Sequence, residues 1–314
     1  MVLIYVDDII VTGNHSGQLQ LFISRLHTMF ALKDLGPLHF FLGIEVHRDA
    51  TGLYLNQSKY VKELLSQLGM LHLKPCPTPM TVGKPLSRTD GTLLENPTAY
   101  HNLIGGLQYL THTRPDLSFV VNKLSQFLQA PTSVHWHAAK RVLRYLKGTI
   151  HYGLHIKFSE KLHLTGFFDA DWACCPDDRK SIAGYCAYLG DTLVSWSSKK
   201  QAVVSRSSTE SEYRALAQVS VEIAWIQALL QEFGFPLPAT PITWCDNMGA
   251  SALAANPVYH ARTKHIELDV HLFAIKYYRK PLMCAMCPLR TKLPIVSQRL
   301  SLKIGFISLL ANME

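Results

Sequence analysis

The stretch L-H-L-T-G-F-F-D, residues Leu162–Asp169, is typical of a β-strand, and it ends in a carboxylate. Two further strand-like segments follow, S-I-A-G-Y-C-A-Y-L-G and T-L-V-S-W-S-S, and a helix is expected over Ser208–Phe233. The strand-like P-I-T-W-C-D then ends at Asp246 and leads into the helical N-M-G-A-S-A-L-A-A. Three strands, a helix, a strand and a helix in this order predict a mixed α/β domain.

Three carboxylates stand at the ends of these predicted elements. Asp169 ends the first strand, Glu212 lies in the first turn of the long helix near a capping segment at Thr209, and Asp246 ends the fourth strand. Clustered carboxylates repel one another, so a bound cation is expected to neutralise them. Mg²⁺ fits because it prefers oxygen ligands, and two such ions can activate water against a phosphodiester. On spacing alone, helix caps or surface charges are the alternative.

A second acidic pair opens the chain, in M-V-L-I-Y-V-D-D-I-I-V-T-G, residues Met1–Gly13. The β-branched residues on both sides of Asp7 and Asp8 favour two strands, which would expose both aspartates at a hairpin tip. An ordinary turn would explain D-D alone. The longer pattern Y-V-D-D-I is much more specific than D-D alone.

Composition indicates a globular chain, and its excess of basic residues either serves an anionic partner or is generic basicity without one. The chain has 314 residues, 48% of them hydrophobic, which predicts about two domains. Its 31 Lys and Arg against 23 Asp and Glu give a net charge of +8, compatible with nucleic acid. The expected helix over Ser133–Leu146 is basic on one side, and either contacts nucleic acid or is a solvated surface. The basic residues in question are His137, Lys140, Arg141, Arg144 and Lys147.

The sequence shows no sign of secretion or membrane insertion. Seven scattered cysteines form no two-pair zinc pattern and predict reduced thiols. No apolar run is long enough for a transmembrane helix, and the N-terminal run lacks the features of a signal peptide. We therefore expect an intracellular protein, located in the cytoplasm, in a particle or in the nucleus.

The segments around the acids form an ordered set of motifs. In the second half these are D-A-D-W-A, R-K-S-I-A-G-Y, S-W-S-S-K-K-Q, S-S-T-E-S-E-Y-R-A-L, W-C-D-N and H-A-R-T-K-H-I-E. Together they closely resemble the ribonuclease H domain of copia-type LTR retrotransposon polyproteins. Upstream, Y-V-D-D-I, K-D-L-G-P-L-H-F-F-L-G-I-E-V, L-I-G-G-L-Q-Y-L-T-H-T-R-P-D-L and H-W-H-A-A-K-R-V-L-R-Y-L-K-G-T resemble the reverse transcriptase of the same family. The resemblance covers about residues 2–273.

This resemblance implies an α/β fold in which an α+β remnant of the polymerase precedes a ribonuclease H-like mixed sheet. The implied regions are a palm remnant (1–55), a thumb or connection region (56–160), a ribonuclease H-like domain without its last strand and helix (161–273), and a poorly ordered tail (274–314).

The resemblance also assigns functions to individual residues. Asp7 and Asp8 match the metal-binding pair of the polymerase, and Lys33 falls in a block where the family has a lysine near the incoming nucleotide. Asp169, Glu212 and Asp246 match three ribonuclease H carboxylates that hold Mg²⁺. The family's polymerase needs another aspartate and the fingers upstream, so we expect no DNA synthesis by this chain alone.

The tail departs from the family pattern and suggests a frameshift. Residues Arg290–Leu300 can be encoded by codons that, read from the third base, spell D-Q-I-A-D-C-L-T-K-A, the helix that the family carries there. In the family this helix carries a fourth ribonuclease H carboxylate, and a frameshift between about His271 and Met283 would remove it. Glu267 and Asp269 are nearby acids, but they lie in the wrong motif to replace it. His260 and His265 belong to the H-x-R-T-K-H motif or are surface histidines.

The resulting prediction is a fragment of a retrotransposon reverse transcriptase and ribonuclease H. Its ancestral chemistry would be Mg²⁺-dependent cleavage of RNA in an RNA–DNA hybrid, with Lys140, Arg141, Arg144 and Lys147 at the phosphates. Its partners would be nucleic acid and, in an intact element, other parts of the Pol polyprotein. Ribonuclease H activity is expected to be impaired or absent. The alternatives are a non-catalytic nucleic-acid-binding remnant and a pseudogene product that does not fold stably.

Overall fold

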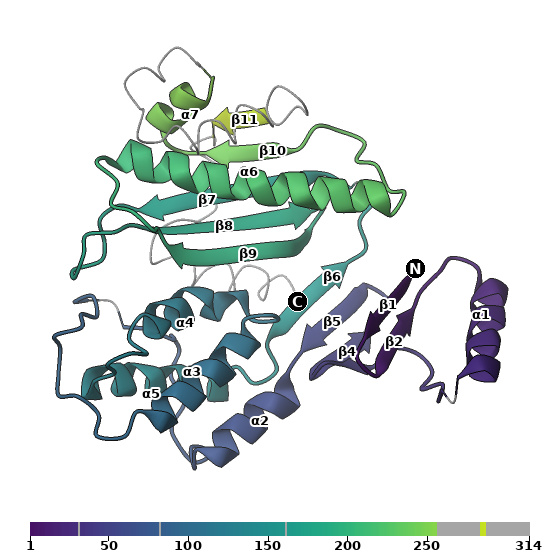
Figure 1. Ribbon diagram of the computed structural model, residues 1–314, viewed down its shortest axis with the longest axis horizontal. Coiled ribbons are helices and arrows are strands. Elements are labelled where there is room, and N and C mark those ends of the chain that lie inside the picture. The colour runs from purple at the N-terminus through teal and green to yellow at the C-terminus, as the bar shows by residue number, and fades with distance from the viewer. Residues whose placement is uncertain (31, 82, 161, 256–282, 287–314) are drawn as a thin grey trace.

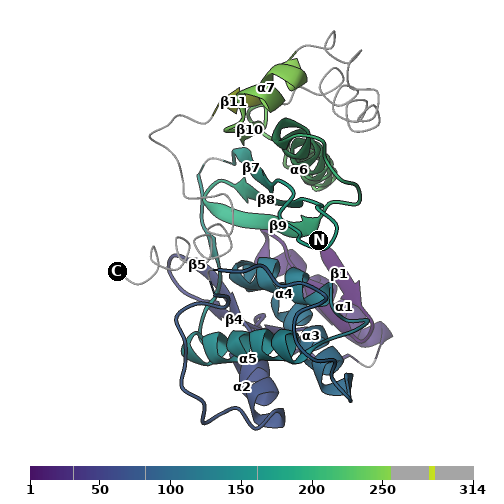
Figure 2. The ribbon, with the colours of Figure 1, turned by 90° about the vertical axis from the view of Figure 1, so that its left-hand side faces the viewer.

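The protein has four structural parts, seen in a computed structural model that describes residues 1–30, 32–81, 83–160, 162–255 and 283–286. A five-stranded sheet carries a long helix along one face, and a helical module lies beside its edge (Figures 1 and 2). A four-stranded sheet and a separate N-terminal hairpin complete the arrangement. The mixture of helices and sheets confirms the predicted α/β class.

The five-stranded sheet has the strand order β11-β10-β7-β8-β9. Strands β7 to β9 form an antiparallel meander, while β10 runs parallel to β7 and β11 runs parallel to β10. The bounds are β7 (Leu164–Asp171), β8 (Ile182–Leu189), β9 (Thr192–Lys200), α6 (Ser208–Glu232), β10 (Ile242–Cys245), α7 (Met248–Ala255) and β11 (Met283–Met286). The order of elements through α7 is the one that the sequence predicts.

The sheet includes a strand from the segment beyond the predicted domain end. Met283–Met286 pairs with β10 from Ile242↔Met283 to Cys245↔Met286, and the predicted loss of the family's own last strand stays a prediction. The physical reason is that backbone groups form the ladder, so a short apolar segment can pair with an open strand edge without a family motif. The expected loss of the last helix concerns residues outside the described part of the chain.

The helical module consists of four α-helices around a leucine-rich core. They are α2 (Ser58–Gln67), α3 (Thr98–Leu110), α4 (Ser118–Ser125) and α5 (Ser133–Gly148), with the short 3₁₀-helix η1 (Pro115–Leu117) before α4. Leu103, Leu107, Leu143 and Leu146 are fully buried in this core. Gly69 follows α2 with a φ of +65°, the left-handed conformation that ends a helix.

A buried ion pair fixes the T-R-P-D segment within the helical module. Arg114 and Asp116 are each 2% exposed, and their side chains form two hydrogen bonds of 2.9 and 2.7 Å. Arg114 also donates to the carbonyl and hydroxyl oxygens of Thr149, and the hydroxyl of Tyr145 donates to Asp116. Burial of a charge is tolerated when every group has a partner, so this network joins η1 to the end of α5.

The four-stranded sheet connects segments that are distant in the sequence. Its antiparallel order is β3 (Phe40–Phe41), β4 (Ile44–Arg48), β5 (Gly52–Asn56) and β6 (Gly153–Lys157). The predicted boundary between residues 55 and 56 falls inside β5, with which β6 pairs, and the domain division stays a prediction. Leu154 of β6 then packs with Cys186 and Leu193, which attaches this sheet to the five-stranded one.

The N-terminal hairpin packs little apolar surface. It comprises β1 (Val2–Tyr5) and β2 (Asp8–Val11), and α1 (Ser16–Met29) follows it. Apolar residues at helical spacing form a stripe along α1, but no residue of this helix is buried. Ile4 and Val6 are 67% and 80% exposed, respectively. The stripe faces solvent because the described part of the chain supplies no element that covers it.

We expect Arg114→Met to lower the free energy of unfolding by about 3–5 kcal/mol, because it leaves the Asp116 carboxylate buried without its cation. Urea unfolding followed by circular dichroism measures the change. Lys62→Met on α2 is the control, since Lys62 is exposed and forms no ion pair with a described residue. A loss below about 1 kcal/mol for Arg114→Met would contradict the assigned role of the pair.

Candidate metal centre

Two of the three predicted carboxylates are brought together by neighbouring parallel strands. Strands β7 and β10 are paired in register up to Phe167 and Trp244. Asp169 and Asp246 each lie two residues further along, so they emerge side by side at the same end of the sheet. Asp169 is 7% exposed, whereas Asp246 follows the end of β10 and is exposed to solvent.

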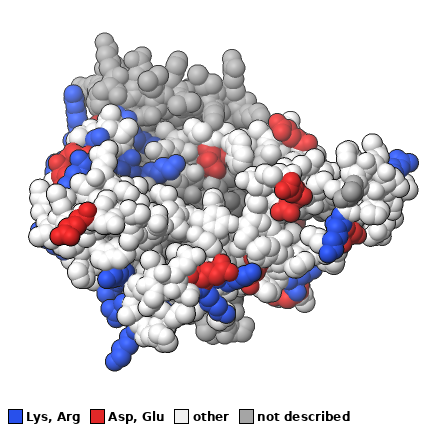
Figure 3. Space-filling view, turned by 60° about the horizontal axis from the view of Figure 1, so that its bottom comes forward, with Lys and Arg blue, Asp and Glu red and all other residues white. Residues whose placement is uncertain are grey.

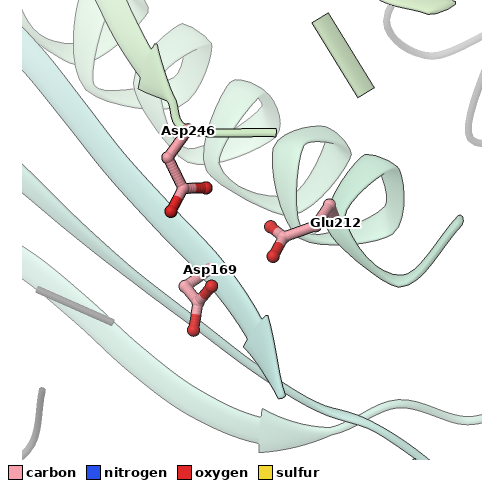
Figure 4. Close-up of side chains that lie close together, drawn as sticks. All are labelled: Asp169, Glu212 and Asp246. Carbon is pink, nitrogen blue, oxygen red and sulfur yellow. The ribbon is translucent and has the colours of Figure 1, made fainter. Parts of the chain in front are cut away.

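The third carboxylate comes from the start of α6, and its position depends on how that helix is capped. The hydroxyl of Ser207 accepts from the backbone N–H of Glu210, and Glu210 accepts from the backbone N–H of Arg206. The cap therefore lies two residues before the Thr209 and Glu212 positions that the sequence suggested. The S-x-x-E spacing of Ser207 and Glu210 is a signal that could have found it. As a result Glu212 does not cap the helix and points toward the two aspartates (Figure 4).

Close packing between α6 and β7 brings Glu212 within reach of the sheet. A Cβ atom on Gly166 of β7 would lie 2.5 Å from Cδ1 of Ile223 and 2.9 Å from Cγ2 of Val219, both on α6. Both of these side chains are buried, so a larger residue at position 166 would push the helix away from the sheet. No local pattern in the sequence distinguishes Gly166 from the other glycines.

The three side chains form a compact group of oxygen ligands. One carboxylate oxygen from each of Asp169, Glu212 and Asp246 lies within 4.8 Å of the others. In the described part of the chain no other His, Cys, Asp or Glu side chains form such a group of three. Glu212 is 7% exposed, and its Oε2 atom is buried without a hydrogen-bond partner. Such an unsatisfied oxygen is costly unless a cation binds it.

The electrostatics of the site also favour a cation. Burial raises the pKa of Glu212, and the charges of Asp169 and Asp246 add to this effect, so that the pKa reaches about 9. The backbone N–H of Ala170 opposes the shift by donating a hydrogen bond to Glu212. A divalent cation would remove the repulsion and hold all three carboxylates ionised. The donor set therefore fits a hard divalent ion such as Mg²⁺.

A nearby fourth acid has a different environment. Asp171 lies two residues beyond Asp169 on β7, but its side chain forms a hydrogen bond with the thiol of Cys174. Burial raises the pKa of this carboxyl group. Asp171 is not part of the group of three, which makes it a matched control for the metal-binding residues.

The N-terminal aspartates lie at a hairpin tip, as the sequence predicts. Tyr5 pairs with Asp8, so Val6 and Asp7 form the turn, and both aspartates are exposed. Val6 has a φ of +49°, which β-branched residues rarely adopt. No third metal-binding side chain joins Asp7 and Asp8 within the described residues. Lys33 is exposed, and it forms no ion pair with a described residue. Its role near a nucleotide stays a prediction.

The basic side of α5 contacts another part of the chain. Arg141 donates to the carbonyl and hydroxyl oxygens of Thr78, Arg144 donates to the carbonyl of Lys74, and Lys147 donates to the carbonyl of Leu73. The ammonium group of Lys140 lies over the ring of Trp136. Arg141, Arg144 and Lys147 therefore hold the segment that follows α2 against the helix. Their contact with phosphates stays a prediction.

Charge on the visible surface is mixed. On the face shown in Figure 3, Lys and Arg side chains are interspersed with Asp and Glu and form no single basic band.

Five cysteines of the described chain are free thiols: Cys76, Cys174, Cys175, Cys186 and Cys245. The predicted positions His260, His265, Glu267 and Asp269 lie outside the described residues. None of the described helices has the length and apolar character needed to cross a membrane.

Comparison with known proteins gives the same relationship along the chain. Residues 1–82 match the family described as reverse transcriptase (RNA-dependent DNA polymerase). The chain is 50% identical over 269 residues to the retrovirus-related Pol polyprotein from transposon RE2 of Arabidopsis thaliana, which covers 86% of this chain and 18% of that polyprotein. It is 46% identical over 226 residues to the uncharacterized mitochondrial protein AtMg00810 of the same plant, covering 72% of this chain and 94% of that protein.

The fold has a solved counterpart. The foamy viral protease-reverse transcriptase in complex with an RNA/DNA hybrid superposes with a TM-score of 0.52 at 12% sequence identity, covering 93% of this chain and 36% of that one. The chain thus combines a reverse transcriptase match at its start, a five-stranded mixed sheet that carries three clustered carboxylates, and close similarity to transposon polyproteins. It belongs to the Pol polyprotein family of copia-type retrotransposons, as a fragment that spans 18% of the length of the RE2 polyprotein.

Proposed function

We propose that Asp169, Glu212 and Asp246 bind Mg²⁺ and hydrolyse the RNA strand of an RNA–DNA hybrid. The observation that carries this proposal is the buried Glu212 carboxylate, which has an unpaired oxygen and lies with two aspartates within 4.8 Å. A bound divalent ion would supply the positive charge that activates water and stabilises the leaving oxygen.

The three side chains have different tasks in this proposal. Asp169 and Glu212 are buried and fixed by the sheet and by α6, so they define the position of the ion. Asp246 is exposed and lies on the open side of the site, where a phosphodiester can approach. The solved neighbour in the foamy viral complex holds an RNA/DNA hybrid, and the net charge of +8 suits the same polyanion here.

We also propose that other parts of a Pol polyprotein cover the N-terminal hairpin and α1. The support is the exposed apolar surface of these elements, in which Ile4 is 67% exposed and α1 has no buried residue. Asp7 and Asp8 would then be part of a polymerase site that includes residues of the covering segment.

The first prediction from this proposal is impaired but detectable Mg²⁺-dependent cleavage of a labelled RNA–DNA hybrid, since the sequence indicates that the family's fourth carboxylate is lost. Asp169→Asn should lower the cleavage rate at least about 100-fold, because it removes a charged ligand of the ion and so raises the barrier by about 3 kcal/mol. Gel analysis of the RNA strand measures the rate, and Asp171→Asn is the matched control that should keep it.

Two results would point to the alternative of a non-catalytic nucleic-acid-binding remnant. One is salt-dependent binding of the hybrid without cleavage by the natural sequence. The other is equal, residual cleavage by the natural protein, Asp169→Asn and Asp171→Asn. That result would show that the three carboxylates do not catalyse the cleavage.

The second prediction concerns the stability of the metal-free protein. The pKa of Glu212 rises from 4.5 to about 9 on folding, so the folded state holds a proton that the unfolded state releases between these pH values. Stability should therefore fall as pH rises from about 5 to 9, and Glu212→Gln should be more stable than the natural protein by about 2 kcal/mol at pH 7.

Thermal unfolding at several pH values, with and without Mg²⁺, measures this effect. Mg²⁺ should stabilise the natural protein and have little effect on Glu212→Gln. Asp171→Asn is again the control and should keep the Mg²⁺ response. Equal pH profiles for the natural protein and Glu212→Gln would contradict the account of the site.

The third prediction tests the covering of the hairpin. The remainder of an RE2-type reverse transcriptase, supplied as a separate chain, should form a complex with this protein in size-exclusion chromatography. Ile4→Asp should abolish the complex because it places a charge in the apolar contact. Leu93→Asp is the control, since Leu93 is equally exposed, at 69%, outside the hairpin. A complex that survives Ile4→Asp would refute the proposed contact.

A further inference from the structure

The position of Glu212 depends on what holds the start of α6. The close packing at Gly166 involves Val219 and Ile223, which lie about two and three turns after Glu212 along the helix. Helix ends fray when local contacts do not hold them. The start of α6, from which Glu212 points toward Asp169 (Figure 4), therefore needs a contact of its own.

A buried glutamine provides this contact. Gln201 directly follows β9 and is 4% exposed. Its backbone N–H donates to the carbonyl of Ser181 over 2.9 Å, which fixes its backbone against the start of β8. Its side chain donates from Nε2 to the carbonyl of Ser211 and accepts at Oε1 from the hydroxyl of Ser205, each over 2.9 Å. Gln201 therefore joins the sheet to the segment before α6 and to the helix itself, one residue before Glu212.

The contacts of Gln201 extend to the strand that carries the other buried ligand. The indole N–H of Trp172 donates to the carbonyl of Ser205 over 2.9 Å, and Trp172 comes directly after β7. A path of three hydrogen bonds therefore runs from the end of β7 through Gln201 to the start of α6. This path links the two elements that supply Asp169 and Glu212.

The amide group of Gln201 suits both of its partners. A carbonyl group can only accept a hydrogen bond, whereas a primary amide offers both donors and an acceptor. Ser205 and Ser211 are 2% and 0% exposed, so loss of the amide leaves a buried hydroxyl and a buried carbonyl with one partner fewer. Such a loss is costly, and we therefore expect the start of α6 to shift when an apolar residue replaces Gln201.

We infer that Gln201 positions Glu212 beside Asp169 by holding the start of α6. The inference rests on the proposed function for the metal that the carboxylates bind, and it adds a residue to that site. Metal ligands must be held within about 0.5 Å of their productive geometry, so a shifted helix start should weaken metal binding. Gln201 is a positioning residue, because its side chain acts on the backbone and hydroxyl groups around the helix start.

Binding of Mn²⁺ to the protein alone tests this inference, since Mn²⁺ takes the same oxygen ligands as Mg²⁺. Gln201→Met keeps a side chain of similar length and removes both hydrogen bonds, so it should weaken Mn²⁺ binding about tenfold. Ser205→Ala removes one of the two bonds and should give a smaller loss, which also provides a milder variant if Gln201→Met does not fold. Electron paramagnetic resonance of free Mn²⁺ measures the affinity, and circular dichroism confirms the fold of each variant.

Two controls separate positioning of Glu212 from a general loss of stability. Gln57→Met is the matched substitution, because Gln57 is 2% exposed and accepts a hydrogen bond from Thr113 in the helical module. It should lower stability and leave the Mn²⁺ affinity unchanged. Added to Glu212→Gln, Gln201→Met should weaken Mn²⁺ binding by less than about twofold, because Gln201 acts through Glu212. An equal loss in both backgrounds would overturn the inference.

The outcomes also separate this inference from the proposed function. Equal Mn²⁺ affinity in the natural protein, Gln201→Met and Ser205→Ala would overturn the inference and leave the proposed hydrolysis in place. A natural protein that binds Mn²⁺ without cleaving the hybrid, and loses this binding in Gln201→Met, would support the inference and refute the proposed enzyme. Absence of Mn²⁺ binding by the natural protein would overturn both.

Discussion

The candidate site depends on how closely α6 approaches β7. Gly166 permits that approach, since a Cβ atom there would come within 2.5 Å of a buried isoleucine of the helix. The same contact fixes the distance between the start of α6 and the sheet. It thereby fixes the position of the Glu212 carboxylate. The cap at Ser207 and Glu210 then fixes where the helix begins, so that Glu212 faces the ends of β7 and β10. Packing, and not a flexible loop, determines the position of this ligand.

The molecule buries ionisable side chains in two places, and it neutralises them in different ways. In the helical module, Arg114 and Asp116 neutralise each other, and Thr149 and Tyr145 complete their hydrogen bonds. At the sheet, Glu212 is buried near two further acids with an unpaired oxygen. The first arrangement stabilises the fold. The second arrangement disfavours ionisation of Glu212 in the metal-free protein, and a bound cation is expected to remove this cost. Buried acids of this kind are typical of functional sites.

Much of the site follows from the sequence, because its residues lie at element ends that local patterns reveal. Asp169, Glu212 and Asp246 end or begin predicted elements, and the structure brings these three together. The contribution of Gly166 could not be predicted, since a glycine inside a strand does not tell which helix approaches it. The strand β11 was missed because backbone pairing selects it without a side-chain pattern. The basic side of α5 was expected either to contact nucleic acid or to be a solvated surface, and its contact with phosphates stays a prediction. Three of its cations, Arg141, Arg144 and Lys147, bind carbonyl groups of residues 73–78, a contact that no local pattern reveals.

The central claim is that the three carboxylates form a divalent metal site. The most direct measurement is anomalous diffraction from crystals of the protein soaked in Mn²⁺, which takes the same oxygen ligands as Mg²⁺ and scatters strongly. The account predicts an anomalous peak bounded by Asp169, Glu212 and Asp246 in the natural protein and no such peak in crystals of Asp169→Asn. Well-ordered carboxylates without a peak at saturating Mn²⁺, or an unchanged peak in Asp169→Asn, would contradict it.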